Sequence, residues 1–190
     1  MRITTMPREY WDHWLATSVH QKTAIHMPFV KEMLQRGISS MLDAGSGRGQ
    51  RIKELAQLGF RITCVDASLT AVTHLRHLSE DPSIKHLNIV RADVLSLPFS
   101  NDSFGAALCF GVLNFFTEVS DRRRAFTEIF RVVKPGGIML FTLMSTEDEG
   151  MKRGQLLGNS NVQLPDGVCL HYFLKYGLPL FVKRRMARER

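Results

Sequence analysis

The sequence predicts an α/β protein of the Rossmann-like, doubly wound type, with helices on both faces of a mostly parallel sheet. Short apolar runs alternate along the chain with segments that repeat apolar residues at helical spacing. The apolar runs are typical of strands buried on both faces, as in a parallel sheet. The alternation of strands and helices therefore predicts three layers, α/β/α.

The first half of the chain predicts three helices and two strands. Gly37 and Gly59 suit helix ends, and Ser68 suits a helix N-cap. The expected helices are 20–36, 50–58 and 68–78, and the expected strands are 40–44 and 60–65.

The second half predicts three more strands and one helix. Strands are expected over 87–91, 104–110 and 138–144, and a helix over 122–133. Pro135-Gly136-Gly137 would stop that helix. Residues 146–190 show little helical periodicity, and 178–182 can form one further strand.

The chain of 190 residues is expected to be a single domain. We divide it into an N-terminal helical cap (1–37), a cofactor-binding core (38–145) and an atypical C-terminal segment (146–190). The composition, 44% hydrophobic and 23% charged, is typical of a soluble globular protein. The polar N-terminus does not resemble a signal peptide, and the longest apolar run, 104–116, is too short to span a membrane.

Cysteine usage and net charge bear on location and partners. The three cysteines are odd in number and far apart, which favours reduced thiols in the cytoplasm over a disulfide or a metal site. The net charge of +7 invites a nucleic-acid partner. No aromatic residues are interleaved with Arg122–Arg124 or with the basic tail at 183–190, however, which disfavours specific RNA binding.

A glycine turn follows the first predicted strand, in the segment Met41-Leu42-Asp43-Ala44-Gly45-Ser46-Gly47-Arg48-Gly49. Glycines at alternate positions allow positive φ angles and a close approach to a ligand. The next helix presents unpaired N–H groups there. Gln50 stands where a nicotinamide fingerprint needs its third glycine, so a dehydrogenase is the weakest reading.

Three carboxylates lie at the ends of predicted strands: Asp43, Asp66 and Asp93. The carboxyl ends of parallel strands meet at one edge of a sheet, where such folds bind ligands. The two oxygens of Asp66 can accept both ribose hydroxyls. Asp93 can accept from an adenine amino group beside the Val94 amide, and an acid at Asp43 suits a cationic amino-acid group. Together with the glycines they predict a pocket for an adenosine-bearing cofactor.

These motifs resemble the class I S-adenosylmethionine-dependent methyltransferases, nearest to the small-molecule type of ubiquinone and menaquinone biosynthesis. The segments Asp93–Phe99, Gly111–Asn114 and Arg131–Gly137 extend the resemblance to about residues 20–145. It implies methyl transfer from S-adenosylmethionine to a small-molecule acceptor by in-line displacement, with S-adenosylhomocysteine as product. The residues expected to bind the cofactor are Asp43, Ala44, Gly45, Ser46, Gly47, Gly49, Asp66, Ala67, Ala92, Asp93, Val94, Phe110 and Gly111.

No residue is marked clearly as a catalytic base. His13 and His171 are the candidates, and a structural histidine is the competing reading of each. His171-Tyr172-Phe173 resembles a loop that borders the acceptor site in some relatives. Tyr10 and Trp11 can form a flap over the cofactor or belong to the core.

The C-terminal segment departs from the family pattern, because the final pair of strands looks incomplete. We therefore expect an open sheet edge, and a homodimer paired through that edge is one outcome. The acceptor pocket is built partly from this region in the family. Two alternatives thus stay open: a non-catalytic cofactor-binding or partner subunit, and an RNA methyltransferase.

Overall fold

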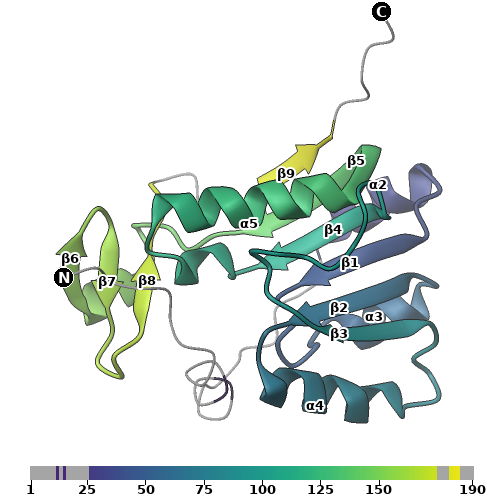
Figure 1. Cartoon of the computed structure of the whole chain (residues 1–190), viewed down its shortest axis with the longest axis horizontal. Helices are drawn as coiled ribbons and strands as arrows, with labels where there is room; N and C mark the ends of the chain where they lie inside the picture. Colours follow the sequence, from purple (N-terminus) through teal and green to yellow (C-terminus); the bar gives the residue numbers. More distant parts are fainter. Residues whose placement is uncertain (1–11, 13–14, 16–25, 175–179, 185–190) are drawn as a thin grey trace, which may run out of the picture.

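Six strands form the central sheet of the computed structural model, which describes residues 12, 15, 26–174 and 180–184. The strand order is β3-β2-β1-β4-β5-β9. The strands are β1 (Ser40–Ala44), β2 (Arg61–Asp66), β3 (Leu87–Arg91), β4 (Phe104–Phe110), β5 (Val133–Thr142) and β9 (Leu180–Lys183). β1 to β5 pair in parallel, and β9 runs antiparallel to β5. Figure 1 shows the twisted sheet and its helices.

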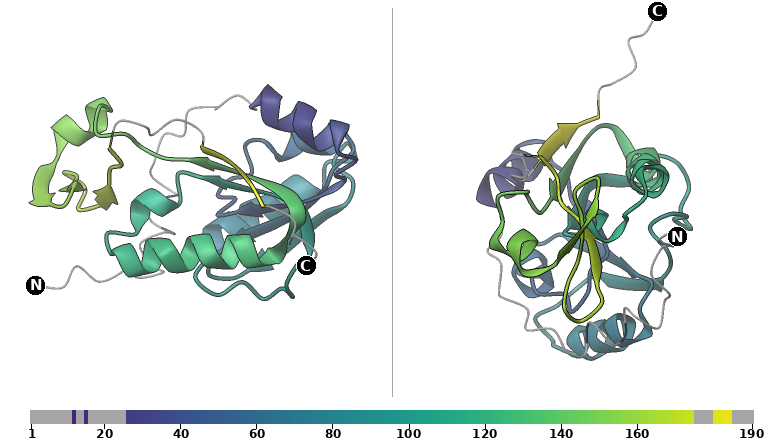
Figure 2. Two further views of the ribbon diagram at one scale, coloured as in Figure 1. Left: turned by 90° about the horizontal axis from the view of Figure 1, so that it is seen from above. Right: turned by 90° about the vertical axis from the view of Figure 1, so that its left-hand side faces the viewer.

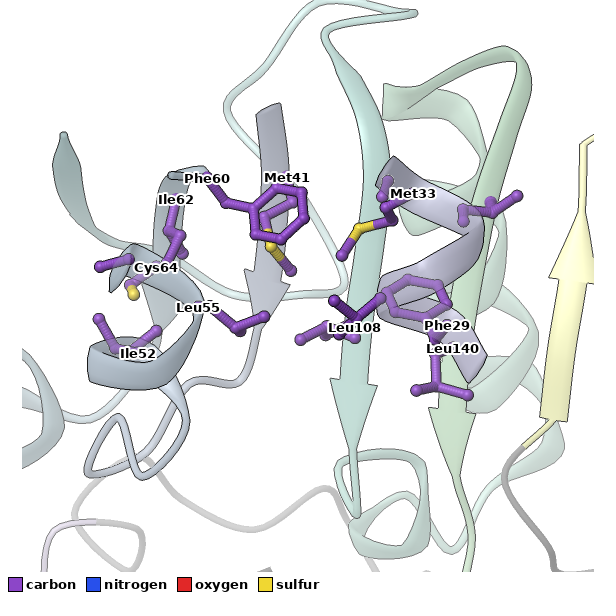
Figure 3. Packing of buried hydrophobic residues seen from close by; sticks show 14 of the residues in the cluster. Phe29, Met33, Met41, Ile52, Leu55, Phe60, Ile62, Cys64, Leu108 and Leu140 are labelled. Atoms are coloured by element: carbon purple, nitrogen blue, oxygen red, sulfur yellow. The ribbon is translucent and has the colours of Figure 1, made fainter. Parts of the chain in front are cut away.

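One face of the sheet is covered by α2 (Met27–Gln35), α3 (Ile52–Gln57) and α4 (Leu69–Ser79). Phe29 and Met33 of α2 and Leu55 of α3 pack on Met41 and Leu108 of the sheet, and all five are almost fully buried. Figure 3 shows these side chains meeting between helix and strand. Burial of this apolar surface holds the three helices to the sheet.

The other face is covered by α5 (Val119–Val132). Ala125 and Ile129 of this helix pack on Leu42, Ala107 and Met139 of the central strands. Two views at right angles show α5 and the other helices on opposite sides of the sheet (Figure 2). The predicted fold class, a doubly wound α/β/α protein, is confirmed.

The predicted strand and helix order of residues 27–142 is confirmed, with small changes at the boundaries. α5 begins three residues earlier than expected, and β5 follows it directly at Val133. Pro135–Gly137 therefore lie within β5 rather than in a separate turn. Ser68 caps α4 as predicted, because its hydroxyl accepts a hydrogen bond from Ala71 N at 3.1 Å.

The C-terminal segment holds a second sheet that the sequence did not predict. The strands β6 (Gln155–Gly158), β7 (Asn161–Gln163) and β8 (Cys169–His171) form an antiparallel meander. The short helix η2 (Glu149–Arg153) precedes it, and β9 follows it as the expected further strand. Phe115 from the short helix η1 (Leu113–Phe115) completes its apolar core with Val162, Leu170 and Tyr172. Figures 1 and 2 show the small sheet at one end of the molecule.

Candidate functional site

The glycine turn lies between β1 and α3 and is tied to the end of β2. The amides of Gly45 and Ser46 both donate to the Val65 carbonyl, at 2.8 and 3.0 Å. Gly45, Gly47 and Gly49 have φ angles of +74°, +52° and +67°. These left-handed conformations favour glycine. A side chain at Gly45 would also collide with Val112, since its Cβ would lie 2.2 Å from Cγ2.

Asp66 joins the turn to the loop that begins α4. Its Oδ2 accepts from Gly47 N and its Oδ1 from Ser68 N, both at 2.9 Å. Burial raises the pKa of Asp66, and these two amide donors oppose the rise. Each carboxylate oxygen has a second lone pair, so both oxygens can still accept from ribose hydroxyls.

Asp43 lies at the end of β1 and is 4% exposed. Burial is the main cause that raises its pKa to about 6, the attraction of Arg51 opposes the rise, and Asp66 adds to it. The Arg51 guanidinium lies 3.6 Å from the centre of the Phe110 ring, a cation–π contact. The sequence reasoning gave Arg51 no role. Its position at the N-cap of α3, just beyond the turn, was the available signal.

The third acid, Asp93, follows β3. Its Oδ1 accepts from Leu95 N at 2.9 Å, which orders the turn that carries Val94. Ala92 N donates to the Asp66 carbonyl at 3.1 Å and links this segment to β2. Gly111, after β4, donates to Thr142 O at 3.1 Å.

The sheet register brings the predicted cofactor residues to one edge. Asp43 pairs with Cys64 of β2 and with Leu108 of β4, and Asp66 pairs with Arg91 of β3. The ends of four adjacent strands therefore carry Asp43, Asp66, Asp93 and Phe110. This is the edge at which doubly wound sheets bind their ligands. The carboxylates and the three glycines of the turn, which carry no side chains, fit a neutral ribose and a cationic amino-acid end.

Two residues of the N-terminal segment lie against this edge. Asp12 Oδ1 accepts from the Ser68 hydroxyl and from Thr70 N, the latter at 2.9 Å. The Leu15 carbonyl accepts from the Arg48 guanidinium. Asp12 and Leu15 thus lie beside the turn and the start of α4, while Tyr10, Trp11 and His13 lie outside the described residues.

His171 belongs to the small sheet. Its Nδ1 lies 2.9 Å from Asn161 Oδ1, and its ring packs edge-on against Phe173. Burial, together with the nearby charge of Arg122, lowers the pKa of His171 to about 4. The ring is therefore neutral at pH 7. With Nδ1 donating to the Asn161 oxygen, Nε2 carries the lone pair.

Asn114 joins the small sheet to the central one. It is fully buried, and its Nδ2 donates to the His171 carbonyl at 2.7 Å. Its Oδ1 accepts from Met144 N at 3.1 Å, just beyond β5. Both sheets are thus anchored to the segment after β4, next to Gly111.

The described residues form no cluster of three or more His, Cys, Asp or Glu side chains that could hold a metal ion. Within the same part of the chain, no helix is long and apolar enough to cross a membrane.

Comparison with known proteins identifies relatives of the central part of the chain. A family model described as a methyltransferase domain matches residues 42–141. A tRNA (carboxymethyluridine(34)-5-O)-methyltransferase of Arabidopsis thaliana is 32% identical over 111 residues, covering 58% of this chain and 25% of that protein. A demethylmenaquinone methyltransferase of Corynebacterium kroppenstedtii is 34% identical over 107 residues, covering 56% and 42%. The chain thus spans less than half the length of both curated relatives.

Solved structures show the same fold. A SAM-dependent methyltransferase of Methanosarcina mazei superposes with a TM-score of 0.70 at 17% identity, covering 84% of this chain and 98% of that one. The N-methyltransferase NodS of Bradyrhizobium japonicum, in complex with S-adenosylhomocysteine, gives 0.61 at 18% identity, covering 73% of each. The [4+2]-cyclase SpnF gives 0.58 at 28% identity, covering 74% of this chain and 47% of that one.

Proposed function

This chain belongs to the methyltransferase domain family, and from that premise we propose that it transfers a methyl group from S-adenosylmethionine to a small-molecule acceptor. The observation that carries the proposal is the position of Asp66. Its carboxylate accepts hydrogen bonds from the Gly47 and Ser68 amides, where the glycine turn lies beside the start of α4. The Asp66 carboxylate is thus a fixed acceptor group beside Gly47, which has no side chain. The family resemblance supports a role for this carboxylate as the ribose ligand.

Three acids divide the binding of the donor between them. Asp66 accepts the ribose hydroxyls, and Asp43 accepts the ammonium of the methionine end. Asp93 accepts the adenine amino group beside the Val94 amide. The bound donor supplies an activated methyl group on its sulfonium. The chain's own residues therefore contribute orientation and exclusion of water more than covalent chemistry.

An acceptor that arrives protonated also needs a base. We propose His171 for that role, because Asn114, three residues after Gly111, donates to its carbonyl and so ties this residue to the segment after β4. Its pKa of about 4 makes the imidazole a weak base. In a His171→Gln variant, donor binding should persist while turnover falls. Unchanged turnover would leave His171 a structural residue of the small sheet. His13, the other candidate, lies outside the described residues.

A small-molecule acceptor is supported by similarity to the demethylmenaquinone methyltransferase. The net charge of +7 and the similarity to the plant tRNA methyltransferase favour RNA instead. The likeness to a [4+2]-cyclase, an enzyme named for a reaction other than methyl transfer, favours the alternative in which this chain does not transfer a methyl group. Assays with radiolabelled donor against a panel of small acceptors and total tRNA separate the three. A methylated small molecule supports our proposal, and methylated tRNA shows that the acceptor is RNA instead. If neither is methylated, the proposed methyl transfer is contradicted.

Donor binding is tested by calorimetry with S-adenosylhomocysteine. Asp66→Ala should weaken binding by at least about tenfold, since a hydrogen bond to a charged group contributes roughly 1.5–3 kcal/mol. Asp81→Ala is the matched control, because Asp81 pairs with Lys53 on the surface, away from the strand ends. Absence of binding by the wild type would refute the proposal.

The homodimer and the cytoplasmic location remain proposals. β9 is an outer strand of the central sheet, which supports pairing through that edge. Light scattering coupled to gel filtration would give a monomer mass if the edge stays unpaired. A fluorescent fusion would test the location.

A further inference from the structure

The segment after β3, residues 92–100, carries the proposed adenine contacts and contains neither helix nor strand. Asp93 and Val94 lie at its start. The side chains of Val94 and Leu97 are buried in the core that also holds Ala125 and Ile129 of α5. The backbone polar groups of such a segment have no partners in a regular ladder, so other groups must satisfy them.

Side chains from one face of α5 bind this backbone. Arg124, Glu128 and Arg131 stand at i, i+4 and i+7 of the helix, which places them on the same side. Arg124 Nε donates to the Leu95 carbonyl at 2.8 Å. The Leu97 amide donates to Glu128 Oε2, also at 2.8 Å. The helix thus contacts alternate residues of the segment.

Arg131 makes the largest number of these contacts. Its Nε and Nη2 each lie 2.9 Å from a carboxylate oxygen of Glu128, a bidentate ion pair. The same guanidinium donates to the Leu97 carbonyl at 3.0 Å and to the Phe99 carbonyl at 2.7 Å. The hydrogen bond from Arg131 lowers the pKa of Glu128, so the pair is charged at neutral pH.

The contacts with α5 reach Asp93 through the main chain. Leu95 is the shared residue, because its carbonyl accepts from Arg124 and its amide donates to Asp93 Oδ1 at 2.9 Å. The Ser96 amide donates to the Asp93 carbonyl, also at 2.9 Å. The turn that orients the Asp93 carboxylate is therefore held by the helix.

We propose that Glu128 and Arg131 of α5, together with Arg124, are positioning residues for the adenine end of the donor. Through the backbone of residues 95–99 they fix the Asp93 carboxylate and the Val94 amide. The inference rests on the proposed function, because it takes the adenine amino group as the ligand of Asp93. A carboxylate that is held before the ligand arrives loses little entropy on binding, and it cannot turn away from a base that offers the wrong group.

The test is calorimetry on the full chain with S-adenosylhomocysteine and with S-inosylhomocysteine, in which a carbonyl replaces the amino group of the base. The wild type should bind S-adenosylhomocysteine at least about tenfold more tightly, the ratio that corresponds to the lower limit for a hydrogen bond to a charged group. In Glu128→Ala and in Arg131→Met this ratio should fall to about threefold or less, because a mobile carboxylate discriminates less.

Two further variants serve as controls. Glu128→Gln keeps a side-chain oxygen that can accept from the Leu97 amide, so it should retain most of the wild-type ratio. Arg123→Met removes an exposed arginine of the same helix, and its ratio should match that of the wild type.

Two results would overturn the positioning role. One is an unchanged ratio in Glu128→Ala and Arg131→Met, even where both ligands bind more weakly, because a merely structural role weakens both alike. The other is a wild type that binds both ligands equally, which removes Asp93 as the adenine acceptor. If these two variants do not fold, Arg124→Met carries the test, since Arg124 is exposed and bonds to Leu95 beside the turn. A wild type that does not bind S-adenosylhomocysteine contradicts the proposed function itself, which distinguishes the failures.

Discussion

Replacement of Gly45 by alanine tests why the turn needs glycine at this position. The two causes to be separated are the left-handed backbone conformation and the lack of room for a Cβ atom. Gly45 has φ +74°, and a Cβ there would lie 2.2 Å from Val112 Cγ2. The left-handed conformation costs roughly 1–2 kcal/mol. Overpacking against Val112 adds roughly 1–3 kcal/mol. We therefore expect Gly45→Ala to lower the free energy of unfolding by about 3 kcal/mol and the Tm by about 6–12 °C.

Gly37→Ala is the matched control. Its φ is +64°, but nothing lies within 4 Å of a Cβ at that position. It should cost only the conformational part, roughly 1–2 kcal/mol. Urea unfolding of both variants, followed by circular dichroism, separates the two contributions. In a double-mutant cycle, Val112→Ala should recover part of the loss in Gly45→Ala, with a coupling of at least about 1 kcal/mol. Equal losses in the two glycine variants, or no coupling to Val112, would refute the steric argument.

Two further predictions concern the small sheet. Asn114→Ala should destabilise the chain by roughly 2–4 kcal/mol, because the His171 carbonyl and the Met144 N–H lose their partner. Amide hydrogen exchange should become faster in residues 155–171. Unchanged exchange there would contradict the anchoring role of Asn114. For His171, the folded pKa of about 4 lies below the ordinary histidine pKa of 6.5. The unfolded chain therefore gains the proton first, and stability should be lost as the pH falls from about 6.5 to about 4. His171→Gln should reduce this loss when Tm is compared at the two ends of that range, whereas parallel losses in variant and wild type would show that other groups cause it.

Much of the central fold could be predicted because its signals are local. Each strand of residues 40–110 is a short apolar run, and each helix repeats apolar residues at its own spacing. Gly59 and Ser68 mark helix ends through backbone conformation and capping, which depend on few neighbours. The order of strands and helices in residues 27–142 follows from these signals.

The small sheet lacked such a signal. Its strands have four, three and three residues, and the four residues of β6 are all exposed. Its core is completed by Phe115, which lies 40 residues or more before the strands. The sequence does carry a turn signal between β6 and β7, the pair Asn159-Ser160. Both residues adopt positive φ angles there, +50° and +58°. Asp166-Gly167 marks the next turn, and two such turns with short strands indicate a meander only when read together.

The sequence by itself determined the donor half of the proposed reaction: a glycine turn and three acids, each placed at the end of a strand by local patterns. Only the tertiary structure decided which groups act on those acids. The charges of Arg51, at the start of α3, and of Asp66, on the paired strand β2, both act on Asp43. Asn114 bonds to the His171 carbonyl because a distant meander folds back on η1. Such contacts depend on packing between segments far apart in the chain, and charge interactions depend on the burial that this packing creates.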